Sequence, residues 1–129
     1  MAELLLFNII DEEKRTAIRL MSVRLGFSFR DISRNHQHLK IHEILAKTER
    51  EVAQEIPFED EMMIMHGFPS ADLNMLLQHM RAGCGPVKLK CVVTETNKNW
   101  TAKQLHDELV REEQAMSRLK QHVHKKRRK

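Results

Sequence analysis

The chain has 129 residues, a length that suits one domain with a real core and is too short for two cores of ordinary size. Its composition, 41% hydrophobic and 31% charged with four glycines and three prolines, excludes disordered, fibrous and membrane-embedded classes of protein. The net charge of +4 does not describe the whole chain, because residues 125–129 hold five of the 22 basic residues and the remainder is nearly neutral.

The first predicted element is a central strand over residues 4–10, an apolar run interrupted only by Asn8. No basic segment precedes this run, and acidic residues follow it directly, which is unlike a signal peptide. The run is also too short to span a bilayer. We therefore expect a cytoplasmic protein with no membrane contact, in which Cys84 and Cys91 are reduced thiols.

A first helix is predicted over residues 12–25. Asp11 suits its N-cap, apolar residues recur with helical spacing, and Gly26 stands where a C-terminal glycine is expected. Residues 27–32 alternate imperfectly and carry charge, which predicts a short edge strand. Rough helical spacing then predicts a crossover helix over residues 39–54, ending before Pro57.

The second half of the chain repeats the alternation of strand and helix. Residues 62–65 form another apolar run, and Ser70 can cap a helix that Gly83 ends. Residues 89–93 predict a strand, followed by a polar turn. Thr101 and Gln104 have capping-box spacing at the start of the last helix. Its predicted buried stripe consists of Leu105, Leu109, Met116 and Leu119.

Four alternating strand and helix pairs predict a small three-layer α/β domain with a four-stranded, mainly parallel sheet. The alternative is a ferredoxin-like α+β domain with an extra C-terminal helix. The predicted helix at 39–54 decides between them, since a loop there would favour antiparallel second and third strands. The expected division is one domain over residues 1–119 and a basic, disordered tail over residues 120–129.

Residues 61–116 resemble a small bacterial family that is described only as a domain of unknown function. The most specific part is the strand-to-helix junction VVTETNKNWT, residues 92–101, with its threonine, asparagine and tryptophan pattern. The start ELLLFNI, residues 3–9, is compatible with the family as well. Because the family has no assigned activity, the resemblance implies a bacterial cytoplasmic protein and no particular chemistry.

In an open parallel sheet, loops at the carboxyl ends of the strands converge on one edge, where ligands usually bind. The candidate ligand-binding residues at that edge are Asn8, Asp11, His66, Ser70, Thr94, Thr96, Asn97 and Trp100. The competing interpretation is structural: threonine and asparagine close turns and cap helices, and a tryptophan there packs over the end of the domain.

These residues favour a non-enzymatic module that binds a small ligand or a protein partner, without a cofactor. One alternative is a nucleic-acid-associated protein that makes weak, salt-sensitive contacts through its tail. The tail residues concerned are Lys125, Lys126, Arg127, Arg128 and Lys129. Another is a small enzyme acting at the same edge, although no nucleophile elbow or glycine-rich phosphate loop is present.

Two further features leave alternatives open. His36, His38 and His42 are spaced closely enough to suggest a metal, but no carboxylate or cysteine stands at a confirming spacing, so surface histidines are expected and no metal site is predicted. A small sheet with a hydrophobic edge also allows a homodimer, in which a second copy covers that edge.

Overall fold

The computed structural model describes residues 2–48, 56–83 and 86–127, with side chains along the last helix as far as Leu119. Four strands form one sheet, in the order β2-β1-β3-β4. The strands are β1 (Glu3–Phe7), β2 (Ser28–Asp31), β3 (Met62–His66) and β4 (Leu89–Val92). The helices are α1 (Glu12–Leu25), α2 (Ile41–Leu45), α3 (Ser70–Gly83) and α4 (Ala102–Arg127), with short 3-10 turns η1 (Arg34–His36) and η2 (Asn97–Asn99).

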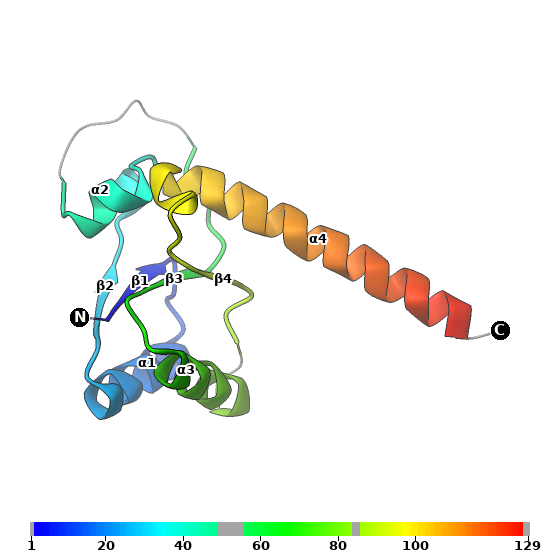
Figure 1. Cartoon of the computed structure of the whole chain (residues 1–129), viewed down its shortest axis with the longest axis horizontal. Coiled ribbons are helices and arrows are strands. Elements are labelled where there is room, and N and C mark those ends of the chain that lie inside the picture. Colours follow the sequence, from blue (N-terminus) through cyan, green and yellow to red (C-terminus); the bar gives the residue numbers. More distant parts are fainter. Residues whose placement is uncertain (1, 49–55, 84–85, 128–129) are drawn as a thin grey trace.

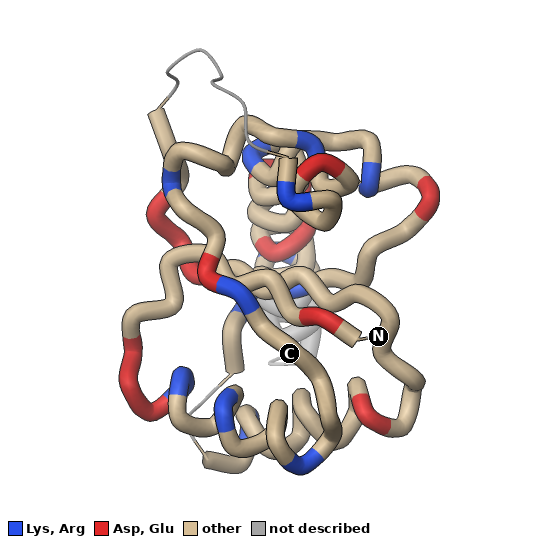
Figure 2. The backbone as a smooth tube through the Cα atoms, turned by 90° about the vertical axis from the view of Figure 1, so that its left-hand side faces the viewer, with Lys and Arg blue, Asp and Glu red and all other residues tan. Residues whose placement is uncertain are grey.

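The sheet lies between two helical layers. Helices α1 and α3 cover one face, while α2 and the beginning of α4 cover the other (Figure 1). Acidic and basic residues are interspersed over both layers (Figure 2). The predicted three-layer α/β domain is therefore confirmed. None of the helices in the described ranges is long and apolar enough to cross a bilayer.

The sheet is mixed because it joins two parallel units. Strand β1 pairs parallel with β2, and β3 pairs parallel with β4. The two units meet through β1 and β3, which run antiparallel with Phe7 opposite Met62 and Glu3 opposite His66. Each unit keeps its two strands as neighbours, whereas the ferredoxin-like alternative requires split units. Two of the three strand pairings are thus parallel, as the sequence predicts.

Alternating residues of the central strands supply two hydrophobic clusters. Leu5 and Phe7 point into the layer of α2 and α4, where they pack with Phe58, Ile64 and Leu105. The opposite face of β1 and β3 packs against α1 and α3, through a second cluster that includes Ile18, Met63 and Leu76. Because both faces of β1 and β3 are buried, residues 4–7 and 62–65 of these strands are all apolar.

Helix α1 has the predicted bounds and the predicted caps. The Asp11 carboxylate accepts hydrogen bonds from the backbone N–H groups of Glu13 and Lys14, at 2.9 and 3.1 Å. Gly26 closes the helix in the left-handed conformation, with φ of 73°. A residue without a Cβ adopts this conformation at little cost, so the glycine stops the helix where the sequence indicates.

Two predicted elements end three residues or more before their expected ends, whereas β2 and β4 differ from their predictions by only one residue at an end. The first strand ends at Phe7 rather than at residue 10, because Asn8 has φ of 58° and turns the chain, leaving Ile10 85% exposed. The helix predicted over 39–54 begins at Ile41 and ends at Leu45, and Lys47 then adopts φ of 58°. Residues 49–54 of that prediction lie outside the described residues.

The cap predicted for α3 is wrong, whereas the cap predicted for α4 is confirmed. The first hydrogen bond of α3 runs from the Leu73 N–H to the Pro69 carbonyl, so Ser70 is the first residue of the helix and not its cap. At α4 the capping box is confirmed: the Thr101 N–H donates to the Gln104 side chain at 2.9 Å, and the Gln104 N–H donates to the Thr101 hydroxyl at 3.1 Å.

Helix α4 packs against the sheet at its beginning and then leaves the domain (Figure 1). Leu105 is buried and Leu109 packs against the same cluster, as predicted. The prediction of burial is wrong for Met116 and Leu119, which are 53% and 59% exposed. The helix itself continues to Arg127, into the segment that the sequence assigns to the tail.

Candidate functional site

The eight candidate ligand-binding residues lie at two opposite edges of the sheet, where an edge means the line along which the strands end and not an outer strand. Since β1 and β3 are antiparallel, the carboxyl end of β1 lies beside the beginning of β3. Asn8 and Asp11 therefore lie at one edge, whereas His66, Ser70 and the segment 94–100 follow strands that end at the other. The expected convergence of all these residues on one edge is thus not observed.

At the first edge, Asn8 and Asp11 hold the backbone in place. The Asn8 side-chain amide donates to the carbonyls of Phe58 and Asp60, at 2.9 and 3.1 Å. It thereby fastens the segment before β3 to the end of β1. Asp11 is the N-cap of α1, as described above. Both side chains make structural contacts of the kind that the competing interpretation predicts.

At the second edge, Asn97 closes the turn between β4 and α4. Its side-chain oxygen accepts from the Thr94 N–H at 2.8 Å, and its amide donates to the Val92 carbonyl at 3.0 Å. The Thr94 hydroxyl in turn accepts from the Asn97 N–H at 3.0 Å. Asn97 is only 8% exposed, so its hydrogen-bonding groups face the turn and not the solvent. Thr96 is exposed beside it.

Trp100 joins this turn to α2. Its ring packs against the hydrophobic cluster between the sheet, α2 and α4, and its carbonyl accepts from the Ile41 N–H at 2.9 Å. A single antiparallel bridge links Lys40 to Thr101 at the same place. These contacts position Trp100 as a cover over the end of the core. His66, the last residue of β3, and Ser70, the first residue of α3, are both exposed.

The sequence patterns do not single out His106, whose imidazole is buried and contacts two carboxylates and an aromatic ring. This residue of α4 is 7% exposed. Its Nε2 lies 2.8 Å from Asp60 Oδ2 and its Nδ1 lies 2.9 Å from Asp107 Oδ1. The ring stacks on Phe58, with centroids 4.2 Å apart and an interplanar angle of 8°. Each ring nitrogen thus lies within hydrogen-bonding distance of a carboxylate oxygen.

The partners of His106 are held by further contacts. Phe58 exchanges two backbone hydrogen bonds with the buried side-chain amide of Gln37, at 2.8 and 3.1 Å. Burial raises the pKa of Asp107, but hydrogen bonds from Lys103 and His106 outweigh this effect and leave the pKa below its ordinary value. Helical spacing could have indicated His106, because it lies four residues after Ala102 and directly after Leu105, on the buried side of α4.

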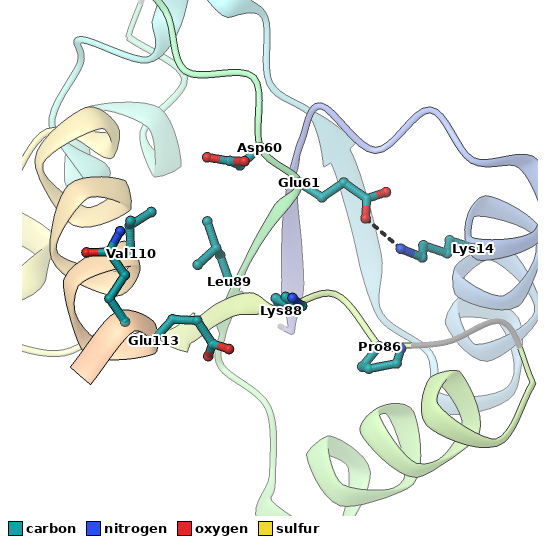
Figure 3. Close-up of a pocket in the computed structure, with 9 residues that line it drawn as sticks. Lys14, Asp60, Glu61, Pro86, Lys88, Leu89, Val110 and Glu113 are labelled. Carbon is teal, nitrogen blue, oxygen red and sulfur yellow. Dashed lines mark hydrogen bonds and ion pairs between the residues drawn. The ribbon is translucent and has the colours of Figure 1, made fainter. Parts of the chain in front are cut away.

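A pocket of about 500 Å³ lies beside this cluster, between α4, the start of β4 and α1 (Figure 3). Its lining combines acidic, basic and apolar side chains. The lining residues are Lys14, Asp60, Glu61, Pro86, Lys88, Leu89, Val110, Glu113 and Gln114. On the side of the pocket formed by α1, Lys14 Nζ is paired with Glu61 Oε1 at 2.5 Å (Figure 3). The most buried basic group of the pocket is thus already neutralised by the protein itself.

Metal and thiol chemistry have little support in the described ranges. Within them, no group of three or more histidine, cysteine, aspartate or glutamate side chains is placed to hold a metal ion. Burial raises the pKa of the Cys91 thiol to about 12, with a smaller contribution from the negative charge of Glu112. Cys91 is therefore a thiol and not a thiolate at neutral pH, which makes it a poor nucleophile.

The outer part of α4, which begins at residue 111, contains the longest run of exposed residues in the described chain. Residues 111–119 are all exposed, and they include the apolar side chains of Met116 and Leu119. Large apolar residues on a solvent-facing helix are informative when they lie in line with a buried stripe. Met116 and Leu119 continue the stripe that Leu105 and Leu109 begin on the domain.

Comparison with known proteins locates a family within the chain. Residues 61–116 match the model of DUF3783, a domain of unknown function. No curated protein and no solved structure matches the chain. The matched segment covers β3, α3, β4 and the part of α4 that carries His106. The resemblance expected over residues 61–116 is thus confirmed for that segment, which makes up less than half of the chain.

Proposed function

We propose that this protein is a non-enzymatic module that binds a protein partner, and that α4 is its binding element. The observation that carries this proposal is the exposure of Met116 and Leu119 on the helix that leaves the domain. Apolar side chains at these positions contribute nothing to the core of the single chain. A partner that covered them would remove apolar surface from water, which stabilises the complex.

The other exposed features support a small-ligand function less well. Asp11 and Asn97 are engaged in a helix cap and a turn, and the candidate residues lie at opposite ends of the sheet. The pocket beside α4 holds an ion pair between Lys14 and Glu61, so a charged ligand would have to displace an existing contact. Helix α4 needs no such rearrangement before it binds a partner.

Site-specific photo-crosslinking in the cells that produce the protein tests this function. A photoreactive amino acid at Met116 should give covalent adducts with another polypeptide on irradiation. The matched control is the same amino acid at Val23, an apolar residue of α1 that is 83% exposed and lies away from α4.

The two positions distinguish a specific surface from general stickiness. Adducts at 116 that are weak or missing at 23 support a partner surface on α4. Equal adduct yields at both positions, no polypeptide adduct at 116, or adducts that disappear with nuclease would each contradict the proposal. The last result would favour a nucleic-acid partner instead.

A further inference from the structure

We infer that the partner of α4 is a second copy of this chain, bound antiparallel along the outer part of the helix. This inference rests on the proposed function and names the partner of the same surface. It starts from the length of α4 beyond its contacts with the domain. Residues 111–127 extend about 25 Å at 1.5 Å per residue. A helix segment of this length without packing is marginal in water.

The apolar stripe of α4 has the spacing of a two-helix seam. Leu105, Leu109, Met116 and Leu119 follow steps of four, seven and three residues, and Glu112 fills the seam position between the two pairs. The first pair contacts the domain and the second pair is exposed. Steps of three and four residues place side chains where a second helix can interdigitate with them. The seam thus continues beyond the domain that covers its beginning.

The charges along α4 are distributed asymmetrically, and this distribution favours an identical helix as the partner. Residues 107–113 include four carboxylates, Asp107, Glu108, Glu112 and Glu113, with one basic residue, Arg111. From Arg118 to Arg127 the sequence has five lysine or arginine residues and no carboxylate. An identical helix in the opposite direction brings each acidic part beside a basic part. A parallel copy would bring like charges together.

In the antiparallel arrangement, Met116 of one copy lies opposite Leu119 of the other, on either side of the two-fold axis. Such an axis makes the contact self-complementary and closed, which limits the assembly to a dimer. The exposed Glu113 and Glu112 then face the basic part of the other helix. Because only two apolar residues per copy are available in the described part of the exposed seam, we expect a weak, concentration-dependent dimer.

Sedimentation equilibrium of the full purified chain tests this inference, with no other protein present. The wild type should shift from monomer to dimer as its concentration rises. Met116→Glu with Leu119→Glu should weaken the dimer roughly tenfold or more, because it places charge in the seam. Met116→Ala with Leu119→Ala should also weaken the dimer. Because alanine favours a helix, this variant separates loss of the apolar contact from loss of the helix. Val23→Glu is the matched control and should leave the association unchanged.

Charge variants test the direction of the second helix. Glu112→Lys with Glu113→Lys should weaken an antiparallel dimer several-fold, because it opposes basic residues to basic residues. The same change should leave a parallel dimer nearly unaffected, since like charges meet there before and after the substitution. High salt should weaken the wild-type dimer for the same reason.

The outcomes separate this inference from the proposed function. A chain that stays monomeric at every concentration, or a dimer that the Met116 and Leu119 variants do not weaken, would overturn the second copy as partner. In the latter case another surface, such as the edge strand β4, would be the contact. If Met116 nevertheless crosslinks to a different polypeptide in cells, the proposed function stands without this inference. If both experiments fail, both proposals fall.

Discussion

His106 fixes the first turns of α4 to the domain through contacts of two kinds. Its ring stacks on Phe58 and its nitrogens lie within hydrogen-bonding distance of Asp60 and Asp107. Phe58 is itself held by the side chains of Asn8 and Gln37. The imidazole therefore connects α4 to the segment before β3. It has a structural position that accounts for its burial without a catalytic role.

We expect His106→Ala to destabilise the domain by about 2–3 kcal/mol, because it removes a buried ring and leaves a cavity beside Phe58. His106→Phe retains the stacking and should cost about 1 kcal/mol, the net value of the lost hydrogen bonds. Asp60 is largely exposed, which keeps its share of that value small. The free energy of unfolding in urea measures both changes.

His66→Ala is the matched control for these variants. His66 is an exposed residue at the end of β3, so its loss should change the free energy of unfolding by less than about 0.5 kcal/mol. Equal effects at positions 66 and 106 would contradict the role given to His106.

The ion pair between Arg15 and Asp31 predicts a pH dependence of stability. The two guanidinium nitrogens lie 2.7 and 2.8 Å from the two carboxylate oxygens and connect α1 to β2. The hydrogen bonds from Arg15 hold the pKa of Asp31 below its ordinary value. A lowered pKa in the folded state means that the ion pair stabilises the fold above the unfolded pKa of about 4. This contribution disappears as the pH falls through the lowered pKa of Asp31.

Asp31→Asn should therefore reduce the free energy of unfolding by less than about 1 kcal/mol at pH 7, since the carboxylate is more than half exposed. The difference from the wild type should shrink as the pH falls through the lowered pKa of Asp31. Urea unfolding at a series of pH values from 7 downward measures it. A double-mutant cycle with Arg15→Gln provides the control: Arg15→Gln should cost less once Asp31 is replaced, because among the side-chain hydrogen bonds of Arg15 only the one to the Ile9 carbonyl is then left to lose. A difference that grows as the pH falls would be inconsistent with the ion pair.

At the scale of elements, the turn between β4 and α4 depends on Asn97. Its side chain satisfies two backbone groups of the turn and is buried. Asn97→Ala should cost about 2–3 kcal/mol, because it leaves the Thr94 N–H and the Val92 carbonyl without these partners. Thermal or urea unfolding measures this loss of stability.

Asn99→Ala is the matched control in the same turn. The Asn99 side chain is exposed and makes one hydrogen bond, 3.2 Å from its nitrogen to the Glu95 carbonyl. Its replacement should change stability by less than about 0.5 kcal/mol. If Asn97→Ala were as mild as Asn99→Ala, the residue would be available for a ligand and the structural interpretation would be wrong.

Most elements are predictable from the sequence because their signals are local. Asp11 and Gly26 define α1, and the Thr101 and Gln104 pair starts α4. The early end of α2 has no such signal, since the left-handed residue after it is Lys47 and not a glycine. Helical spacing alone therefore extends that prediction beyond the observed helix.

At the scale of the whole molecule, the direction of strands and the surroundings of helices are not local properties. A strand that is apolar on both faces, such as β1 or β3, has the same pattern in either direction. The antiparallel contact between these strands, which separates Asn8 from Asn97, is therefore invisible in the sequence. Likewise, periodicity predicts a stripe through Met116 but not whether the same chain covers it.

We propose that a second copy of the chain covers the exposed residues 112–119 of α4. Hydrogen–deuterium exchange, measured by mass spectrometry on dilute and concentrated protein, tests this proposal most directly. Amides of residues 105–110 should be protected in both samples, because their helix packs on the sheet. Amides of residues 112–119 should exchange rapidly in the dilute sample and gain protection when the protein is concentrated. Strong protection of residues 112–119 in the dilute monomer, unchanged on concentration, would contradict the claim.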